Sequence, residues 1–465
     1  MTNVAAFNNS DLLAVLGPAA THLPTEVVVR GVSTDTRTLE PGNAFIALIG
    51  ERFDAHSLVL DAFEKGASLA VVDEQWLTSA PDSIRSRCVG VASTLHALGS
   101  FAWWHRKRFE IPVIAIGGAA GKTSTKDVVA HVLGVAMNVL KTPGNLNNQI
   151  GTPLTLLQLA PSHEAAVIEI GTNEPGEIET LCAMVQPTHG LITNIGKEHL
   201  EKLRDLDGVE REETALFDYL ADHGGVAFVN NDDARLRQHA WRLTKCVTFG
   251  IDTDANVRPT VRFDAALHPD LHMVYGDFTF RAVMQTQGLA AARNAVCAVA
   301  IAWTLNCTAD EVRLGLQTFQ PPPSHGYARM SVEAIESLHN VVVLNDCYNA
   351  NPESVTLALD TLARYPASTR IAVLGDMREL GHAAATEHAD VLRYACSIAD
   401  HVVLYGQEFQ AALETTPFVT NAVWCSTHEA CANAVRDFAT AGTAVLVKGS
   451  RGCTMEHVIT ALRQV

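Results

Sequence analysis

The sequence lacks an excess of positive charge. Its 465 residues include 34 Lys and Arg against 51 Asp and Glu, so the formal net charge at pH 7 is -17. Nucleic acids and anionic membrane surfaces are bound through basic protein surfaces. We therefore expect neither as a partner, and any anionic ligand must be held by local dipoles, a few Lys and Arg side chains and metal ions.

Paired cysteines and long apolar runs are also missing. The ten cysteines are scattered, none forms a C-x-x-C pair, and several lie inside apolar segments. This pattern is typical of small buried side chains in a reducing cytosol, not of a disulfide framework or a zinc site. The N-terminus does not resemble a signal peptide, and the longest apolar run, around residues 295–305, is too short to span a bilayer. We predict a soluble, cytoplasmic protein.

Three regions can be distinguished along the chain, as expected for a length that exceeds one hydrophobic core. Residues 1–108 contain short strand-like pieces at 26–32, 44–48 and 69–72 and end in the helical segment FAWWHRKRFE. In residues 109–318 and 319–465, apolar strand candidates alternate with helical stretches. This rhythm predicts an α/β protein with mostly parallel sheets covered on both faces.

The strand candidates can be placed by their apolar residues. Those of the second region are 113–116, 166–170, 190–195 and 226–230, and those of the third are 341–344, 371–374, 401–405 and 444–447. Residues 247–287 have shorter alternating pieces, which predict a hairpin-rich insertion.

A phosphate-binding turn is predicted at residues 113–126, VIAIGGAAGKTSTK. Here an apolar strand runs into glycines and then into a helix, so that backbone N–H groups and the helix dipole face an anion. Lys122 supplies a positive charge, and the Thr123 hydroxyl can hold Mg²⁺. The spacing differs from the generic P-loop because Ile116 stands five residues before Gly121, so a chance Gly/Ala-rich turn is the alternative. The residues expected around the phosphates are Gly118, Gly121, Lys122, Thr123 and Ser124.

Polar residues follow several strands, where open α/β sheets bind ligands. Glu169 lies inside an apolar run, which favours a Mg²⁺ ligand over a structural ion pair. His199 follows the next strand, although alone it would more often be a structural histidine. The segment 145–157, NLNNQIGTPLTLL, is rich in amides, which suit an oxygen-rich ligand or an Asx-rich turn.

Several segments together carry a resemblance to a known family: GKTSTK, NLNNQIGTPLTLL, EIGTNEPGEI, NIGKEHLE, NDCYNANPESV, VLGDMRELG and VLVKGSRGCTME. In this order they resemble the Mur ligases, and most closely the F-type members. The segment GVSTDTRTLEPGNAFIALIGERFDAH also looks like that family's uridine-nucleotide-binding domain. The resemblance implies an N-terminal UDP-substrate α/β domain, a central P-loop ATPase domain, and a C-terminal Rossmann-like domain that helps to bind the amino substrate.

The resemblance also implies the reaction. In this family the γ-phosphoryl group of ATP passes to a substrate carboxylate, and an amine then attacks the acyl phosphate and releases phosphate. Positioning and charge neutralisation dominate such catalysis. For F-type members, D-alanyl-D-alanine is joined to a UDP-N-acetylmuramoyl-tripeptide in cytoplasmic peptidoglycan precursor synthesis. We therefore expect ATP and Mg²⁺ as cofactors, these two small molecules as substrates, and a monomer.

The residue roles that the resemblance implies are as follows. Lys122 would hold the β- and γ-phosphates, Thr123 and Glu169 one Mg²⁺, and His199 a second Mg²⁺ that bridges the γ-phosphate and the acyl oxygen. Residues expected at the nucleotide are Asn294 at the adenine, Asp346 and Asn349 at the ribose and phosphates, and Arg329. Residues expected at the UDP-sugar are Ser33, Thr34, Asp35 and Arg37. The other substrate-binding candidates are Asn145, Asn147, Asn148, Tyr348 and Asn351. For the C-terminal motif residues, a turn or domain-interface role is the alternative.

The chain departs from the family's pattern at several positions. Ala290 and Ala291 stand where the family usually has His-Asn, and Gly117 stands where the P-loop usually has Thr or Ser. Glu213 aligns with a lysine that the family carbamoylates to support the second metal. We predict that Glu213 is catalytic, as a permanent carboxylate that acts on Mg²⁺ through a water. The alternative is a solvated member of an acidic run.

Two other functions are open from the sequence. One is a Mur-type amide ligase that acts on a different acid and amine, and the other is a non-catalytic nucleotide-binding relative. The joint presence of Lys122, Thr123, Glu169 and His199 speaks against the second.

Overall fold

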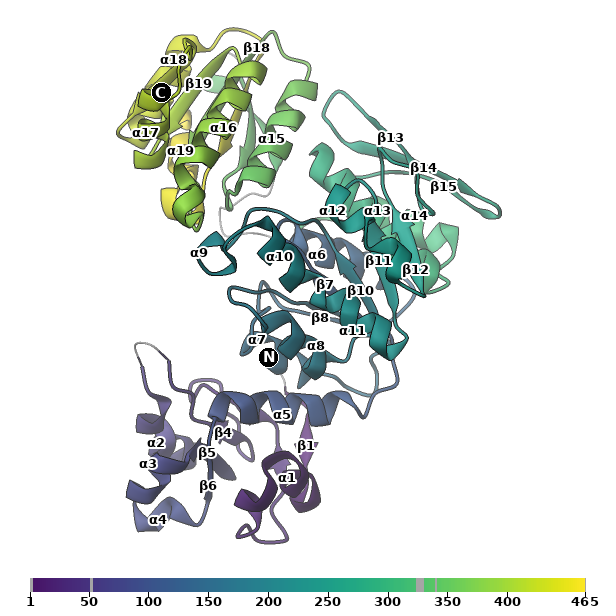
Figure 1. Ribbon diagram of the computed structural model, residues 1–465, viewed down its shortest axis with the longest axis vertical. Coiled ribbons are helices and arrows are strands. Elements are labelled where there is room, and N and C mark those ends of the chain that lie inside the picture. Colours follow the sequence, from purple (N-terminus) through teal and green to yellow (C-terminus); the bar gives the residue numbers. More distant parts are fainter. Residues whose placement is uncertain (1–2, 51–52, 323–329, 339–340, 465) are drawn as a thin grey trace.

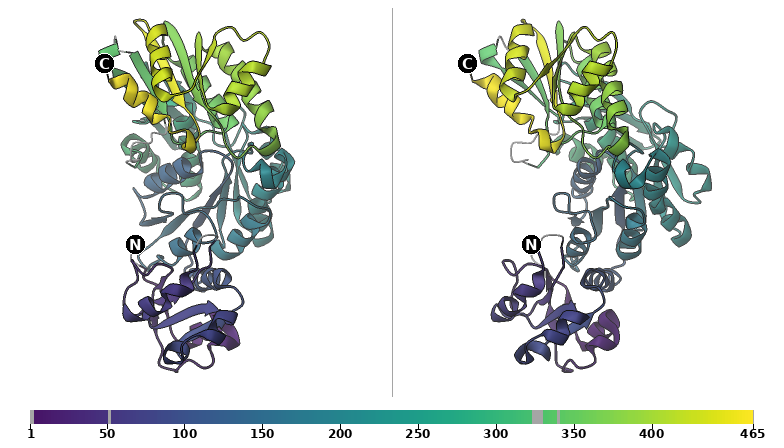
Figure 2. Two further views of the ribbon diagram at one scale, coloured as in Figure 1. Left: turned by 90° about the vertical axis from the view of Figure 1, so that its left-hand side faces the viewer. Right: turned by 60° about the vertical axis from the view of Figure 1, so that its left-hand side comes forward.

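The computed structural model describes residues 3–50, 53–322, 330–338 and 341–464. Figure 1 shows the elements in three groups along the long axis of the molecule: an N-terminal group at one end, a central group in the middle and a C-terminal group at the other end. Two further views in Figure 2 show the same order. Arg329, which was predicted to lie near the nucleotide, is outside the described residues.

The N-terminal group is built on a small parallel sheet with the strand order β3-β4-β5-β6 and on the antiparallel pair β1-β2. Its strands are β1 (Ala6–Phe7), β2 (Val29–Arg30), β3 (Val32–Ser33), β4 (Ala44–Ile46), β5 (Leu69–Asp73) and β6 (Cys88–Val91). Its helices are α1 (Asn9–Leu16), α2 (Val59–Glu64), α3 (Glu74–Ser79), α4 (Asp82–Arg85) and α5 (Thr94–Arg106). The single strand predicted at 26–32 is wrong, because Gly31, with φ +91°, divides it between the two sheets.

Helix α5 joins the N-terminal and central groups. The Ser93 hydroxyl accepts the N–H of His96 at the helix start, and the helix buries Phe101, which packs edge-on against Phe7. The same hydrophobic core continues into Leu156 and Ile178 of the central group. Helix α5 therefore lies in a hydrophobic core that the N-terminal and central groups share (Figure 1).

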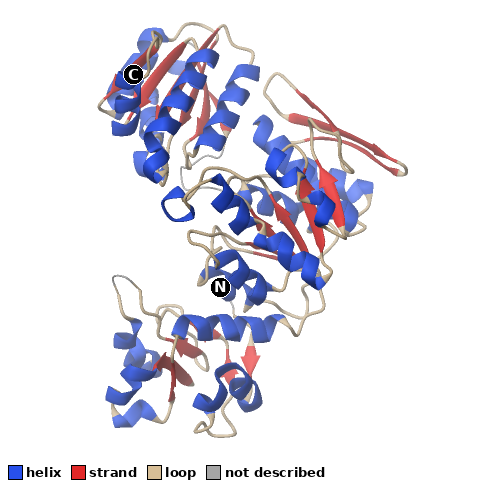
Figure 3. Cartoon of the chain, in the orientation of Figure 1, coloured by secondary structure: helices blue, strands red, loops and turns tan. Residues whose placement is uncertain are grey.

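The central group is built on a parallel sheet with the strand order β12-β11-β10-β7-β9-β8. Its strands are β7 (Val113–Gly117), β8 (Val139–Lys141), β9 (Ala165–Glu169), β10 (His189–Ile192), β11 (Val226–Asn230) and β12 (Cys246–Phe249). Its helices are α6 (Lys122–Leu133), α7 (Gly151–Leu156), α8 (Glu177–Val185), α9 (Leu200–Leu203), α10 (Leu206–Glu213), α11 (Ala215–His223), α12 (Ala234–Arg237), α13 (Gly288–Thr304) and α14 (Ala309–Thr318). Helices flank both sides of this sheet (Figure 3).

The insertion predicted at 247–287 is partly confirmed. β13 (Thr260–Phe263), β14 (Pro269–Tyr275) and β15 (Phe278–Val283) form an antiparallel meander that projects from the side of the central group (Figure 1). However, residues 247–249 belong to β12, which pairs in parallel with β11 in the central sheet. The strand predicted at 190–195 also ends early, at Ile192, and the residues after it form the loop that contacts the P-loop.

The C-terminal group has a sheet with the strand order β16-β17-β21-β18-β19-β20, in which only the β16–β17 pair of the described strands is antiparallel. Its strands are β16 (Ser331–Ile335), β17 (Val341–Asp346), β18 (Thr369–Gly375), β19 (His401–Tyr405), β20 (Ala422–Cys425) and β21 (Thr443–Lys448). Its helices are α15 (Pro352–Arg364), α16 (Ala384–Ile398), α17 (Gln407–Thr415), α18 (His428–Phe438) and α19 (Glu456–Arg463). The predicted α/β class with mostly parallel sheets is confirmed, whereas the boundaries at 108/109 and 318/319 stay predictions. Within the described ranges, no helix has the length and apolar character needed to cross a membrane.

Candidate active site

The P-loop connects the end of β7 to the start of α6. Gly118 has φ +112°, and a Cβ there would lie 2.3 Å from the Thr193 hydroxyl oxygen, so the turn requires glycine. Asn194 holds the loop, because its backbone and side-chain oxygens accept the N–H groups of Ala119 and Ala120. The N–H groups of residues 121–123 point out of the start of α6 and have no acceptor among the described residues. They are therefore free to bind an anion.

Thr123 and Glu169 meet at the start of α6. The Thr123 hydroxyl donates to Glu169 Oε1 over 3.0 Å, and the amide of Asn147 donates to the same oxygen over 2.9 Å. The other oxygen, Oε2, is buried and accepts no hydrogen bond within the described part of the chain. Lys126, also buried, lies 3.5 Å from Oε2 and was not anticipated.

These groups fit a Mg²⁺ ion. A hydroxyl and a carboxylate are hard oxygen ligands, and the buried Oε2 of Glu169 leaves an acceptor for which the described residues provide no hydrogen bond. His199 is not among the contacts of this pair, and the described residues contain no cluster of three or more His, Cys, Asp and Glu side chains that could hold a metal. Thr123 and Glu169 therefore fit the first predicted metal position, and their role there, like that of His199, stays a prediction.

Lys122 is surrounded by carboxylates. Its ammonium donates to the Gly118 carbonyl oxygen and lies 3.3 Å from Glu198 Oε2. Burial lowers the pKa of Lys122, but the negative charges of Glu198, Glu213 and Glu169 more than compensate, so its pKa is raised. The lysine stays charged, and its ammonium lies between the Gly118 carbonyl oxygen and Glu198.

Glu213, the last residue of α10, is fully buried beneath the P-loop. Its Oε2 accepts the N–H of Gly118 over 2.7 Å, and a Cβ at Gly117 would lie 2.7 Å from the same oxygen. Burial raises the pKa of Glu213 to about 8, with Glu198 adding to the rise and Lys122 opposing it. The alternative of a solvated acidic residue is wrong, because the side chain occupies the space that Gly117 leaves open.

The loop after β10 contacts the C-terminal group. The N–H of Lys197 donates to Glu353 Oε1 over 2.8 Å, and its ammonium lies 2.5 Å from Glu387 Oε1. His199, with φ +49°, has its Nδ1 3.2 Å from Glu379 Oε2. Burial raises the pKa of Glu353, and the N–H of Lys197 opposes this rise. Residues of α15, α16 and the loop after β18 therefore hold the predicted metal-ligand loop.

A cavity of about 470 Å³ lies beside these contacts, at the carboxyl ends of β18 and β19. It is lined by Glu201 of the central group and, among others, by Asp376, Arg378, Glu379 and Glu408 of the C-terminal group. Arg378 forms no hydrogen bond or ion pair with any residue that the structure describes. A free guanidinium and several carboxylates in one cavity can bind a small molecule with both charges.

The nucleotide candidates of the C-terminal group lie at the end of β17. Asp346 Oδ2 is 2.6 Å from the ammonium of Lys448, whose other contact is the Asn349 carbonyl oxygen. Asn349 Oδ1 accepts the N–H of Arg451. Tyr348, between them, is half-buried. On α13, Asn294 Oδ1 accepts the hydroxyl of Thr125 and thus lies against the first turn of α6.

Other predicted substrate residues have structural partners. Asn148 Oδ1 accepts the N–H groups of residues 150 and 151, and Asn351 Oδ1 caps α15 by accepting the N–H of Ser354. These contacts are those of the Asx turn and the turn role given as alternatives. Asn145 is exposed.

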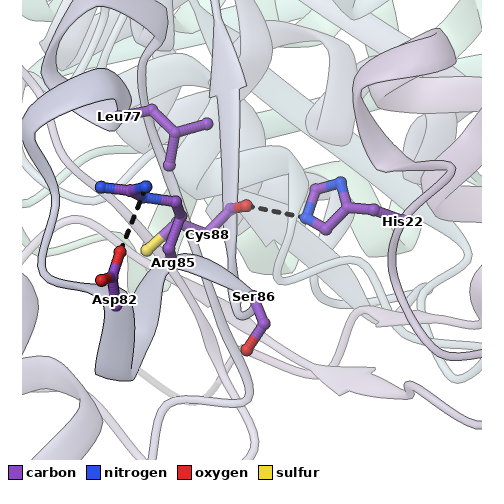
Figure 4. Close-up of a pocket in the computed structure, with 6 residues that line it drawn as sticks. All are labelled: His22, Leu77, Asp82, Arg85, Ser86 and Cys88. Atoms are coloured by element: carbon purple, nitrogen blue, oxygen red, sulfur yellow. Dashed lines mark hydrogen bonds and ion pairs between the residues drawn. The ribbon is translucent and has the colours of Figure 1, made fainter.

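The predicted UDP-sugar residues lie together at the end of β3. Arg37 forms a bidentate pair with Asp35, and the Asp35 N–H donates to the Ser33 hydroxyl. The guanidinium lowers the pKa of Asp35 through its hydrogen bonds. Thr34 lies between them in the chain. A separate hollow of about 450 Å³ (Figure 4), lined by His22, Leu77, Asp82, Arg85, Ser86 and Cys88, contains none of these residues.

Comparison with known proteins places this geometry in a family. Residues 116–302 match the Mur ligase middle domain, and residues 328–451 match the domain described as "Mur ligase, glutamate ligase domain". The UDP-N-acetylmuramoyl-tripeptide--D-alanyl-D-alanine ligase of Escherichia coli is 31% identical over 454 residues, which cover 94% of this chain and 95% of that protein. The chain belongs to the Mur ligase family. The predicted resemblance is therefore confirmed.

Solved structures agree with this assignment. MurF from Acinetobacter baumannii superposes with a TM-score of 0.86 at 28% identity, covering 100% of both chains. MurF from Thermotoga maritima, solved in complex with ADP, has a TM-score of 0.81 at 23% identity and covers 93% of this chain and 97% of its own. The three-domain Mur ligase architecture predicted from the motifs is thus confirmed.

Sequence reasoning missed two charged residues of this Mur ligase site, Lys126 and Glu198. Lys126 lies one helical turn after Lys122, on the same face of α6, and this spacing was a usable signal. Glu198 is next to His199 in a loop, and nothing in its local sequence distinguishes it from a solvated acid.

Proposed function

We propose that this Mur ligase joins D-alanyl-D-alanine to a UDP-N-acetylmuramoyl-tripeptide at the expense of ATP, as the name of its E. coli relative states for that protein. The observation that supports this is a P-loop with free N–H groups beside the Thr123–Glu169 pair, in a chain that aligns with that ligase over 94% of its length. The substrates are soluble precursors, and we propose that the protein acts as a cytoplasmic monomer.

The residues of the chain have defined tasks in this reaction. The N–H groups at the start of α6 and the ammonium of Lys122 bind the phosphates and neutralise the charge that shifts during phosphoryl transfer. Thr123 and Glu169 would hold Mg²⁺, which when bound supplies further charge neutralisation on the phosphate oxygens.

We place the dipeptide in the 470 Å³ cavity between Glu201 and the loop after β18. Arg378 would bind its carboxylate, and the carboxylates of the cavity would bind its ammonium group. The contact between Glu379 Oε2 and His199 Nδ1 connects this cavity to the loop beside the P-loop, so the amine would lie near the activated acid.

A phosphate-release assay tests the proposed function. We expect turnover only when ATP with Mg²⁺, a UDP-muramyl tripeptide and D-alanyl-D-alanine are all present. Comparable rates with a nucleotide-free acid would contradict the assignment of the acid, and faster turnover with another amine from a panel would contradict that of the dipeptide. No phosphate release with any pair would favour the non-catalytic alternative.

A further inference from the structure

Lys126 is a buried lysine to which the proposed reaction gives no task. It lies in the second turn of α6, and only 1% of its side chain is exposed. Its ammonium donates to the Gly144 carbonyl oxygen and lies 3.5 Å from Glu169 Oε2 and 3.7 Å from Asp127 Oδ1. An ammonium group is costly to bury unless it is paired, so these partners are what allows a lysine at this position.

The contacts of Lys126 form part of a closed ring. Glu169 Oε1 accepts the side-chain amide of Asn147 over 2.9 Å, and Asn147 belongs to the same loop as Gly144, between β8 and α7. The ring therefore contains the contacts of Glu169 with two side chains, the contact of Lys126 with a carbonyl oxygen of the loop, and the loop itself. It attaches the loop at two points, one on α6 and one at the end of β9.

The loop fits closely against the end of β9. A Cβ at Gly171 would lie 2.8 Å from Asn147 Nδ2, so a side chain there would displace the amide that binds Glu169. The Gly171 N–H also donates to the Asn147 carbonyl oxygen over 2.9 Å. Gly144 is itself exposed, yet its carbonyl oxygen accepts a hydrogen bond from the buried ammonium. The two attachment points therefore differ in burial but belong to the same ring.

We propose that Lys126 is a positioning residue, which fixes the Glu169 carboxylate for Mg²⁺ and holds the loop of residues 144–148 with it. Because Oε2 lies beside the ammonium and Oε1 beside the amide of Asn147, the carboxylate is held in one orientation, in which Oε1 also accepts the Thr123 hydroxyl. Such outer contacts orient the ligands of metal ions. The inference rests on the proposed function only for Mg²⁺ at Glu169.

The ring also reaches a substrate-binding candidate. Asn145 is exposed and lies in the chain between Gly144 and Asn147, the two attachment points of the loop. Its position therefore depends on both attachments. Lys126 in this way connects the metal position with the loop that presents Asn145.

Removal of the ammonium has two opposed effects on a cation at Glu169. Loss of a positive charge 3.5 Å from the carboxylate favours the binding of a cation, whereas loss of the carboxylate's orientation weakens it. If Lys126 acts only through its charge, Lys126→Met should bind Mn²⁺ more tightly. If it is a positioning residue, the same variant should bind Mn²⁺ more weakly.

Manganese binding tests the proposal without reference to turnover. Free Mn²⁺ is measured by electron paramagnetic resonance in titrations of the full-length protein, with and without the non-hydrolysable analogue AMP-PNP. Glu169→Gln identifies the ion that binds at this position. We expect Lys126→Met to weaken the binding of that ion by about tenfold or more, and Asn147→Ala, which changes no charge, to weaken it as well. The two changes together should cost less than the sum of their separate effects, because either one opens the ring.

Lys141→Met is the matched control. Lys141 is also a cation near Lys126, but its ion pair in the described part of the chain is with Asp127, so Mn²⁺ should bind as in the unmodified protein. Tighter or unchanged Mn²⁺ binding in Lys126→Met, additive effects of Lys126→Met and Asn147→Ala, or no ion affected by Glu169→Gln would each overturn the inference. Thermal unfolding without metal shows whether each variant is folded. If Lys126→Met is not, unchanged Mn²⁺ binding in Asn147→Ala overturns the inference alone.

Calorimetry with AMP-PNP separates the two proposals. If the unmodified protein does not bind AMP-PNP, the ATP-dependent function is contradicted, while the Mn²⁺ titration without nucleotide still tests Lys126. If it binds AMP-PNP and Lys126→Met leaves the Mn²⁺ affinity unchanged, only the positioning role is contradicted.

Discussion

Gly117 and Glu213 should be energetically coupled, and a double-mutant cycle can measure this. A Cβ at Gly117 would lie 2.7 Å from Glu213 Oε2, which is too close. The next nearest atoms would be 3.8 Å from it, which is an ordinary van der Waals distance. Gly117 does not have a positive φ, so alanine can adopt its backbone conformation. The obstacle to Gly117→Ala is therefore the carboxylate alone.

The loss of folding stability in Gly117→Ala follows from the hydrogen bond that the Glu213 carboxylate would lose. If it retreats from the new methyl group, the Gly118 N–H loses its acceptor in a buried site, at about 1–3 kcal/mol. For a unit of 150–250 residues, each kcal/mol shifts the thermal midpoint by about 2–4 °C, so Gly117→Ala should lower it by about 2–12 °C. In the Glu213→Ala background the methyl group meets no carboxylate, and the same change should cost less than about 0.5 kcal/mol.

The assay is thermal unfolding of the four proteins of the cycle at one pH without nucleotide. The comparison uses differences between midpoints, because a three-domain chain need not unfold in a single transition. Glu210→Ala in place of Glu213→Ala is the control, and its effect should add to that of Gly117→Ala. Equal midpoint shifts for Gly117→Ala in both Glu213 backgrounds would refute the coupling, and no shift in the unmodified protein would refute the contact itself.

Two other predictions concern the same site. Lys122→Ala removes the cation that we propose for the phosphates, and turnover should fall by about 10²-fold or more. The change in UDP-substrate affinity should be smaller, because the residues predicted to bind the UDP-sugar lie in the N-terminal group. Comparable losses in both, measured by steady-state kinetics and calorimetry, would contradict a specific catalytic role. Because burial raises the pKa of Glu213 from 4.5 to about 8, the folded protein holds a proton there that the unfolded chain releases. Stability should therefore fall as the pH rises from about 4.5 to about 8 and be independent of this group above that range. The thermal midpoint of Glu213→Gln, followed over the same pH series, should fall less steeply, and identical slopes for the two proteins would count against a buried carboxyl group.

The strands that the sequence predicted well are those with continuous apolar runs. β11 and β19 begin and end where they were placed, because the three central residues of each strand are apolar and buried. β16 and β20 were not anticipated; both lie at the sheet edges, and all but the last residue of each is at least partly exposed. In β16, Ser331 and Glu333 interrupt the apolar run on which such a prediction depends, whereas β20 is apolar but only four residues long.

Contacts in the candidate active site could be predicted from the sequence where a single strand end or turn brings the residues together. Thr123 and Glu169 meet because the P-loop and β9 end at the same edge of a parallel sheet. The contacts of Glu198, Glu213 and His199 depend on the path of the loop after β10, the end of α10 and the C-terminal group, which are distant in the sequence. No local pattern encodes their partners, so only the folded chain shows them.

The cavity between Glu201 and the loop after β18 has walls from two groups of elements, so it exists only while those groups keep this arrangement. A ligand that fills it binds this arrangement in preference to a more open one and shifts the population toward it. A compound that binds in this cavity would therefore contact both groups of elements and stabilise their present arrangement. Such a compound would need no resemblance to a nucleotide, because none of the residues predicted to bind the nucleotide lines this cavity.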